Sequence, residues 1–151
     1  MPAMPDSHTP EQRRHNMSRI RSSGTTPETR LRTLLLAMFP EAVIEEHSAA
    51  LPGKPDFYLP DMRLAVFADG CFFHRCPRHY IAPVNNSDYW SAKIERNRQR
   101  DRENNRKLRN LGIKFVRIWE HNLGRDLTLA RRQIRRAVRA AKLAHSPSSD
   151  N

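Results

Sequence analysis

The 151-residue sequence predicts a single α/β domain in which helices flank a mixed β-sheet. Three observations lead to this fold class. Apolar residues recur at helical spacing in three segments, and shorter segments between them have the apolar runs or alternation of strands. The order is helix, three strands, helix, strand, helix, which is typical of one layered α/β domain. The length is also sufficient to bury a core without disulfides.

Residues 1–21 are predicted to form a basic N-terminal arm. Thr9 and Pro10 suit a helix start, and a short basic helix over about 10–20 should follow. Its apolar content is limited to Met17 and Ile20, so the arm has little to anchor it to a core. We expect the domain itself to span residues 22–143, followed by a disordered tail over 144–151.

The first helix of the domain begins at Thr26-Pro27-Glu28 and stops at Pro40. Its inward face should consist of Leu31, Leu34, Leu35 and Met38. Glu28 lies in the first turn, where a carboxylate complements the helix dipole, and this role alone is sufficient to explain it.

Three strands are expected next, over Ala42–His47, Pro55–Leu59 and Arg63–Ala68. The last contains the uninterrupted apolar run Leu64–Ala68, which predicts a central strand buried on both faces. It is followed by Asp69 and Gly70. Polar residues at the end of a buried strand are where α/β proteins build their sites.

Residues 71–86 are rich in Cys, His, Pro and Asn and are predicted to form a structured loop. Ser87-Asp88 should open a long helix that ends near Leu111, with Gly112 just beyond it. A strand over Ile113–Trp119 and an Arg-rich amphipathic helix over Asp126–Leu143 complete the domain. The inward residues of that helix should be Leu127, Ile134, Val138 and Ala141.

The charge distribution points to a polyanionic partner. The formal net charge is +11, and all of this excess lies in residues 91–151, which carry 17 basic and 6 acidic residues. A phosphate backbone is the simplest partner for such a surface, and a solvated pair of basic helices is the alternative. No apolar run approaches a membrane-spanning length and no secretion signal opens the chain, so we expect a cytoplasmic protein without a membrane partner.

Asp56 is the first candidate site residue. It follows Pro52-Gly-Lys-Pro55 at the start of a strand, where two prolines and a glycine fix the backbone. A carboxylate there suits Mg²⁺, which prefers oxygen ligands. A turn aspartate is the alternative. Asp69, at the end of the next strand, favours the interpretation as a metal or acid/base pair.

Cys71, Cys76 and His79 lie within nine residues, and His121 follows the last strand. Because a reduced cytosolic protein has little use for a disulfide, these four residues predict a tetrahedral structural Zn²⁺ site. Free buried thiols and surface histidines are the alternative.

Phe72 and Phe73 lie between the two cysteines and either pack in the core or wedge between DNA bases. His74, next to them and near Asp69, is a credible general base. The following helix carries a stripe that is apolar at its ends and polar at its middle. It is either a solvated edge or a face that turns Asn97 and Asp101 toward the cleft of Asp56; its members are Trp90, Ile94, Asn97, Asp101, Asn105 and Leu108.

Taken together, these segments resemble the very short patch repair endonucleases, the Vsr family of bacterial mismatch-nicking enzymes. The resemblance spans about residues 10–140. The motifs that carry it are Met17-Ser-Arg-Ile20, Leu51-Pro-Gly-Lys-Pro-Asp-Phe57, Asp69-Gly-Cys-Phe-Phe-His-Arg-Cys-Pro-x-His79, Tyr89-Trp-x2-Lys-Ile-x2-Asn97-x3-Asp101 and Val116-Arg-Ile-Trp-Glu-His121.

The resemblance implies a restriction-endonuclease-like PD-(D/E)xK core in which Asp56 holds a catalytic Mg²⁺, to which the carbonyl of Ala68 also reaches. It implies that His74 activates the attacking water, with support from Asp69, Glu28 and Asp101. No Glu-x-Lys motif follows Asp56, so His74 takes the place of the usual nuclease lysine. Zinc is assigned to Cys71, Cys76, His79 and His121. The implied DNA contacts are Phe72, Phe73, Trp90, Lys93, Asn97 and Arg19.

The expected function is therefore Mg²⁺-dependent nicking of one strand beside a T:G mismatch, which arises when 5-methylcytosine deaminates. The products would be a 3′-hydroxyl and a 5′-phosphate. We expect a monomer that acts on duplex DNA at the bacterial nucleoid, alongside mismatch-repair proteins and a cytosine-5 methyltransferase. Two alternatives remain: a sequence-specific nuclease of the same fold, and a non-catalytic, zinc-stabilised DNA-binding module.

Overall fold

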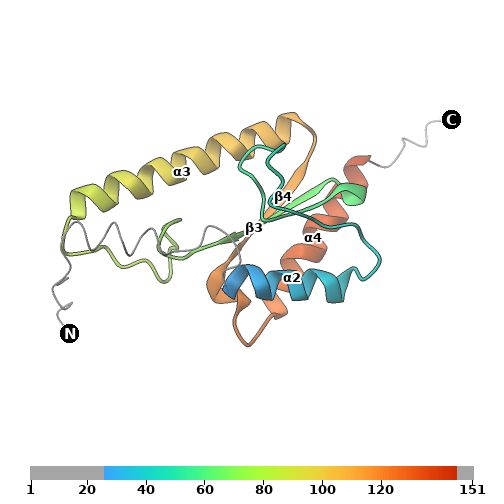
Figure 1. Ribbon diagram of the computed structural model, residues 1–151, viewed down its shortest axis with the longest axis horizontal. Coiled ribbons are helices and arrows are strands. Elements are labelled where there is room, and N and C mark those ends of the chain that lie inside the picture. The colour runs from blue at the N-terminus through green and yellow to red at the C-terminus, as the bar shows by residue number, and fades with distance from the viewer. Residues whose placement is uncertain (1–25, 146–151) are drawn as a thin grey trace.

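The computed structural model describes residues 26–145; the predicted arm with Arg19, and residues 146–151, lie outside this part of the chain. A four-stranded sheet lies between two helical layers (Figure 1). In chain order the elements are α2 (Thr26–Met38), β1 (Glu45–Glu46), β2 (Phe57–Leu59), the 3-10 turn η1 (Pro60–Met62), β3 (Leu64–Asp69), α3 (Ser87–Asn110), β4 (Lys114–Trp119), the 3-10 turn η2 (Glu120–Leu123) and α4 (Thr128–His145).

The sheet has the strand order β1-β2-β3-β4. The first two pairings are antiparallel, and β3 pairs with β4 in parallel over six residues, from Leu64 opposite Lys114 to Asp69 opposite Trp119. The parallel pair requires a crossover, which α3 supplies. This arrangement confirms the predicted mixed sheet flanked by helices.

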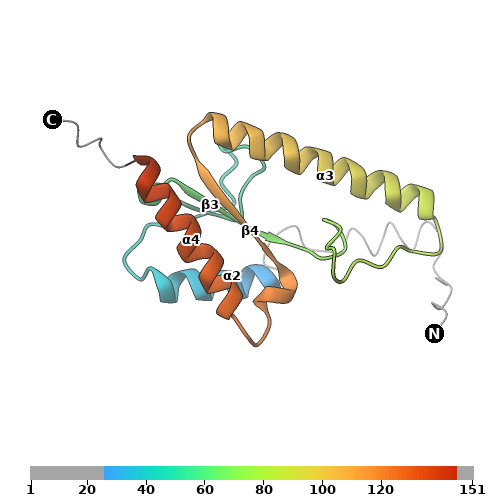
Figure 2. The same ribbon diagram turned by 180° about the vertical axis from the view of Figure 1, so that it is seen from behind.

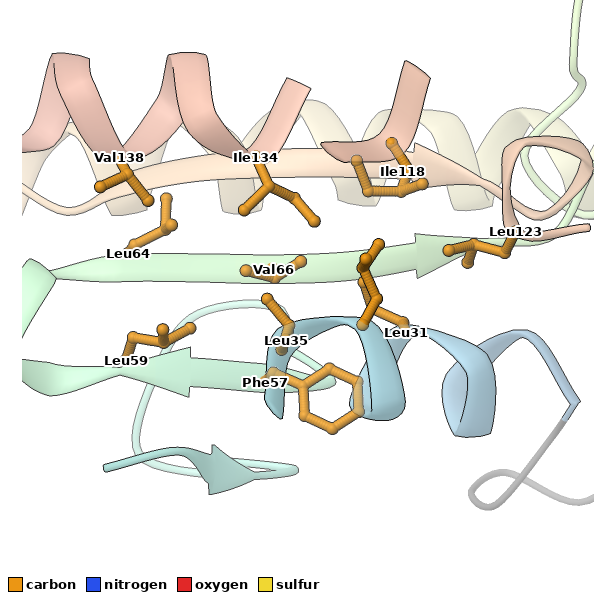
Figure 3. Close-up of a cluster of buried hydrophobic side chains, with 12 residues drawn as sticks. Leu31, Leu35, Phe57, Leu59, Leu64, Val66, Ile118, Leu123, Ile134 and Val138 are labelled. Carbon is orange, nitrogen blue, oxygen red and sulfur yellow. The ribbon is translucent and has the colours of Figure 1, made fainter. Parts of the chain in front are cut away.

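Helices α2 and α4 cover one face of the sheet. Figure 3 shows Ile134 and Val138 of α4 directed at Leu64 and Val66 of β3, with Leu31 and Leu35 of α2 packed beside them in the same cluster. Residues 64–67 of β3 are at most 5% exposed, as the uninterrupted apolar run predicted. At about 25 cal/mol per Å² of apolar area removed from water, this cluster is the main source of stability.

The other face of the sheet is covered by α3, through a smaller cluster of Ala65, Phe67, Leu108 and Ile113. Only the C-terminal part of α3 packs there, and its N-terminal half extends past the sheet beside the 71–86 segment (Figures 1 and 2). The helix ends as predicted, because Gly112 adopts the left-handed φ of 71° that glycine accommodates at a helix end. None of the described helices has an apolar stretch suited to crossing a membrane.

Several predicted boundaries were wrong. The strand expected over 42–47 is reduced to Glu45–Glu46 at the sheet edge, because the Ala42 amide donates to the Phe39 carbonyl in a turn. The second strand begins at Phe57 rather than Pro55, and β3 begins after Arg63, whose φ is 49°. The last helix runs from 128 to 145 instead of 126 to 143, so residues 144 and 145 are helical and do not belong to a disordered tail.

Candidate active site

A cavity of about 510 Å³ opens at the edge of the sheet where β3 ends. The predicted catalytic residues come together in it from five separate segments. Helix α2 contributes its first turn, the approach to β2 contributes Gly53–Asp56, β3 contributes its last residues, the 71–86 segment contributes His74, and α3 contributes its middle. The carboxylate, imidazole and guanidinium groups that line the cavity are Glu28, Asp56, Asp69, His74, Asp101, Arg117 and Glu120.

One group of metal-ligating side chains forms around Asp56. Its carboxylate Oδ2 accepts a 2.8 Å hydrogen bond from the Ala68 amide, which ties the approach to β2 to the end of β3. Glu28 is 5% exposed and its Oε2 lies 3.5 Å from Nε2 of His47. Ligand atoms of Glu28, His47 and Asp56 all lie within 4.8 Å of one another, so the three residues could hold a metal ion.

Burial, together with the neighbouring charge of Glu28, raises the pKa of Asp56 to about 6 against the opposing hydrogen bond from the Ala68 amide. Two carboxylates held together out of water repel each other, and a bound cation relieves that repulsion. Below about pH 6 a cation must displace a proton from Asp56, so cation binding should weaken as the pH falls through that value.

A second group pairs His74 with Asp101. His74 Nδ1 lies 2.5 Å from Asp101 Oδ2, and its Nε2 lies 3.9 Å from Asp69 Oδ1. Burial lowers the pKa of the imidazole, but the hydrogen bond to Asp101 and the negative charge of Asp69 outweigh this and leave it raised. The Asp101 contact fixes the orientation of the ring and leaves Nε2 available to a water molecule.

Arg117 of β4 holds the carboxylates of this second group in place. Its Nη1 lies 3.0 Å from Asp69 Oδ1 and 3.7 Å from Asp101 Oδ1, and its Nε donates to Asn105 at 3.0 Å. Its guanidinium also lies over the Phe67 ring, 4.0 Å from the ring centroid. Burial raises the pKa of Asp69, and the charge of Arg117 opposes that rise.

The four predicted zinc ligands are brought together beside the cavity. Cys71 and Cys76 Sγ lie 3.3 and 3.6 Å from His121 Nδ1, and Cys76 Sγ lies 3.7 Å from His79 Nδ1. All four ligand atoms lie within 4.8 Å of one another, a cluster that could hold a metal ion. Burial and the neighbouring His79 lower the pKa of His121, which keeps the ring in the neutral form that a metal requires.

The loop between the two cysteines presents aromatic rings at the cavity wall. Phe72 and Phe73 both line the cavity and both are half-buried. The Phe72 ring packs edge-on against Phe73 and Trp90, with centroids 5.2 and 5.3 Å apart. The amine of Lys93 lies 5.6 Å from the Trp90 centroid. These rings therefore form a partly exposed cluster of their own, outside both core clusters.

The polar residues in the middle of the α3 stripe face the cavity and the loop beside it. Asp101 contacts His74, Asn105 contacts Arg117, and the Asn97 amide donates to the Phe73 carbonyl at 3.3 Å. Ile94 and Leu108, nearer the ends of the stripe, are buried. The interpretation as a solvated edge was therefore wrong for these polar residues.

Sequence reasoning missed three residues of the site. His47 was assigned only to a strand, and Arg117 only to a strand and to the Val116–His121 motif. Glu120, which accepts a 2.8 Å hydrogen bond from the Cys71 amide, was not singled out. The register of the sheet would have found the first two, since β1–β2 pairing brings His47 opposite Asp56 and β3–β4 pairing brings Arg117 beside the end of β3.

Comparison with known proteins identifies the family. A family model described as DNA mismatch endonuclease Vsr matches residues 5–79. The chain is 39% identical over 121 residues to the Type II nicking enzyme V.NaeI of Lentzea aerocolonigenes, covering 78% of this chain and 73% of that protein. It is 38% identical to the Type II nicking enzyme V.XorIIP of Xanthomonas oryzae pv. oryzae, covering 80% and 88%. It is 33% identical to the DNA mismatch endonuclease Vsr of Escherichia coli (strain K12), covering 78% and 74%.

An α/β domain with a carboxylate-lined cavity, a basic surface and these relatives is an endodeoxyribonuclease, a hydrolase that acts on DNA. The chain belongs to the DNA mismatch endonuclease Vsr family. Membership of this family favours an enzyme over the non-catalytic DNA-binding module that the sequence had left open.

Proposed function

We propose that this enzyme nicks one DNA strand beside a T:G mismatch. The observation that carries the proposal is the cavity at the end of β3, where the Asp56 cluster and the His74–Asp101 pair share one space with Phe72 and Phe73. Residues suited to phosphodiester hydrolysis thus lie beside aromatic rings that could stack on the bases of a distorted DNA step.

Mg²⁺ would be held by Asp56 and Glu28, with the Ala68 carbonyl as a further oxygen ligand. The buried carboxylate pair suits a divalent cation, and when bound this ion would supply charge stabilisation to the phosphate in the transition state. His47 adds a nitrogen donor to the same cluster.

Zn²⁺ fits the Cys71, Cys76, His79 and His121 cluster. Zn–S distances of about 2.3 Å and Zn–N distances of about 2.0–2.1 Å put sulfur and nitrogen roughly 3.5–3.6 Å apart around a tetrahedral ion. The three sulfur–nitrogen separations of 3.3, 3.6 and 3.7 Å bracket this value. Four protein ligands leave no open position, so this ion would be structural.

In the proposed reaction, His74 Nε2 removes a proton from the attacking water. The water oxygen forms a bond to phosphorus as the bond between phosphorus and the 3′ oxygen breaks. The 3′ oxygen takes up a proton from solvent, which leaves a 3′-hydroxyl and a 5′-phosphate. Asp101 holds the His74 ring, Asp69 stabilises the imidazolium that forms, and Arg117 keeps both carboxylates in place.

Mismatch selection would come from the aromatic cluster. A T:G wobble pair stacks less well than a regular pair, so separating it from its neighbour costs less, by a few kcal/mol. Phe72, Phe73 and Trp90 can occupy such an opened step. Lys93 and Asn97 on the same face of α3 would contact the flanking backbone, as would Arg19 of the arm.

Sequence-specific nicking is the second candidate. It is favoured by the names of V.NaeI and V.XorIIP, both Type II nicking enzymes. The two functions differ in one result, because only a mismatch enzyme ignores a fully paired duplex of the same sequence.

The fold family, the cellular location and the functional partners are part of the same proposal. The mixed sheet with Asp56 and Asp69 near adjacent strand ends supports a PD-(D/E)xK-type core. Bacterial relatives, one of them a DNA mismatch endonuclease, support action on DNA in the cytoplasm. Mismatch-repair proteins and a cytosine-5 methyltransferase are part of the proposal as functional partners.

Asp56→Asn tests the catalytic assignment. It removes the charge of the cation ligand and keeps its shape, so nicking should fall by about 10³-fold or more while binding to T:G DNA persists. Asp61→Asn on the exposed turn η1 is the matched control and should leave nicking unchanged. Near wild-type nicking by Asp56→Asn would refute the assignment.

A further inference from the structure

Helix α4 carries a basic surface that the proposed chemistry does not use. Its buried side, formed by Ala130, Ile134, Val138 and Ala141, packs on the sheet. The outer side has arginines on two adjacent rows, three at i, i+4 and i+8 and two at i and i+4, and no Asp or Glu occurs anywhere in the helix. We name this set the α4 arginine face; it consists of Arg131, Arg132, Arg135, Arg136 and Arg139. No other described element covers the outer side of α4 (Figure 2).

These charges are not neutralised within residues 26–145. No ion pair or hydrogen bond involves the side chain of any of the five arginines within that span. On α3, by contrast, Glu95 pairs with Arg98 at 3.6 Å and Arg102 at 3.2 Å. Like charges at i, i+4 destabilise a helix, and cations near its N-terminus oppose the helix dipole. The α4 arginine face therefore does not serve the stability of its own helix.

The same face borders an open groove. Thr128, Leu129 and Gln133 complete its lining around the five arginines, and its volume is about 810 Å³. The side-chain Oε1 of Gln133 is buried without a hydrogen-bond partner, the only such side-chain atom in the described part of the chain. The amide NH₂ group of the same side chain can donate a hydrogen bond to an anionic ligand that lies along the five arginines.

We propose that the α4 arginine face binds the phosphate backbone of the same DNA duplex at a distance from the cleaved bond. The location fits, because α4 begins five residues after η2, whose Glu120 lines the active-site cavity. At 1.5 Å per residue, Arg131 and Arg139 are about 12 Å apart along the helix, a span over which one DNA strand presents more than one phosphate. Planar guanidinium groups bind phosphate oxygens through two hydrogen bonds, and a duplex presents these oxygens at the regular spacing that a helical row of arginines can follow.

This proposal requires DNA as the ligand but does not require a mismatch. It therefore stands or falls independently of the T:G specificity proposed above, and each binding measurement is made on both paired and mismatched duplexes.

The test compares two double variants of the full chain, each placed in an Asp56→Asn background so that DNA is bound but not cut. Arg132→Gln/Arg136→Gln removes two charges from the α4 arginine face. Lys107→Gln/Lys114→Gln removes two exposed charges near the start of β4, at the opposite end of that strand from the cavity. The dissociation constant is measured from 50 to 200 mM salt, and circular dichroism verifies the fold.

We expect the salt slope of log K to decrease by about 1.8 in the α4 variant, or 0.9 for each lost phosphate contact, and to stay unchanged in the control. The loss of affinity between 50 and 200 mM salt would then be about 12-fold smaller than for the parent protein. Salt slopes that stay at the parent value in both folded variants would overturn the proposal, because the α4 arginine face would then make no phosphate contact. An equal decrease in both variants would overturn it too, because net charge alone would then explain the effect.

Discussion

Replacing Phe73 with alanine separates a DNA-contacting ring from a core ring. Phe73 is half-buried, and its one described ring contact is with Phe72, at a centroid distance of 5.2 Å. Phe57, in contrast, is 0% exposed in the main core. A fully buried Phe loses about 3–5 kcal/mol on truncation to alanine, whereas a half-exposed ring with one neighbour should lose about 1 kcal/mol.

Phe73→Ala should weaken the interaction with mismatched DNA more than it lowers the stability of the free protein. Stacking of a base on an aromatic ring contributes about 1–3 kcal/mol, equivalent to a factor of roughly 5 to 150. Because only a mismatched step opens easily, Phe73→Ala should lower kcat/KM on T:G DNA by that factor and leave the residual rate on paired DNA unchanged. Thermal unfolding and single-turnover nicking are measured on the same preparation. Phe57→Ala is the control, a core substitution that should lower the stability of the protein more than Phe73→Ala does.

Two results would refute this reasoning. A folded Phe73→Ala variant with unchanged T:G preference would exclude the ring from discrimination, and hydrogen bonds to base edges would then have to supply it. A loss of 3 kcal/mol or more in stability would show that Phe73 is a core residue.

Three further predictions concern the site. Asp101→Asn should move the acidic limb of the pH–rate profile to lower pH, since loss of the carboxylate lowers the raised pKa of His74 and the base is then neutral at lower pH; an unmoved limb would exclude His74 as the base. Cys76→Ser should release zinc, measured by elemental analysis, and abolish nicking while far-UV circular dichroism retains the sheet, because neither core cluster contains this loop; retained zinc and activity would contradict it. His47→Gln should weaken Mn²⁺ binding, followed by electron paramagnetic resonance, about tenfold, because it removes a nitrogen donor from the Asp56 cluster; equal binding would show that His47 is not a ligand.

Much of the fold could be predicted because local patterns agreed with the final packing. The apolar run of β3 and the helical spacing of Leu31, Leu34 and Leu35 predict buried side chains, and the structure buries these residues. Strand β1 could not be predicted as well, since an edge strand of two residues is set by its partner and not by its own apolar residues.

The candidate site was predictable where its chemistry is local in sequence. Cys71, Cys76 and His79 lie close along the chain, so their spacing alone indicated a metal cluster. His47 and Arg117 could not be found in this way. His47 reaches Glu28 from a left-handed backbone position with φ of 49°, and Arg117 meets Asp69 only through the parallel register of β3 and β4. Both placements are consequences of sheet pairing across distant segments.

The central claim is that the cavity cuts DNA in response to a T:G mismatch. The most direct measurement is the single-turnover nicking rate on a panel of duplexes that are identical except at one position, where each contains a regular pair or one of the single mismatches. Our account predicts that T:G is nicked about 10²-fold faster than the paired duplex, in line with an opening cost of a few kcal/mol, and that the cut leaves a 5′-phosphate. Equal rates on the paired and T:G duplexes of one sequence would contradict it and identify a sequence-specific nicking enzyme.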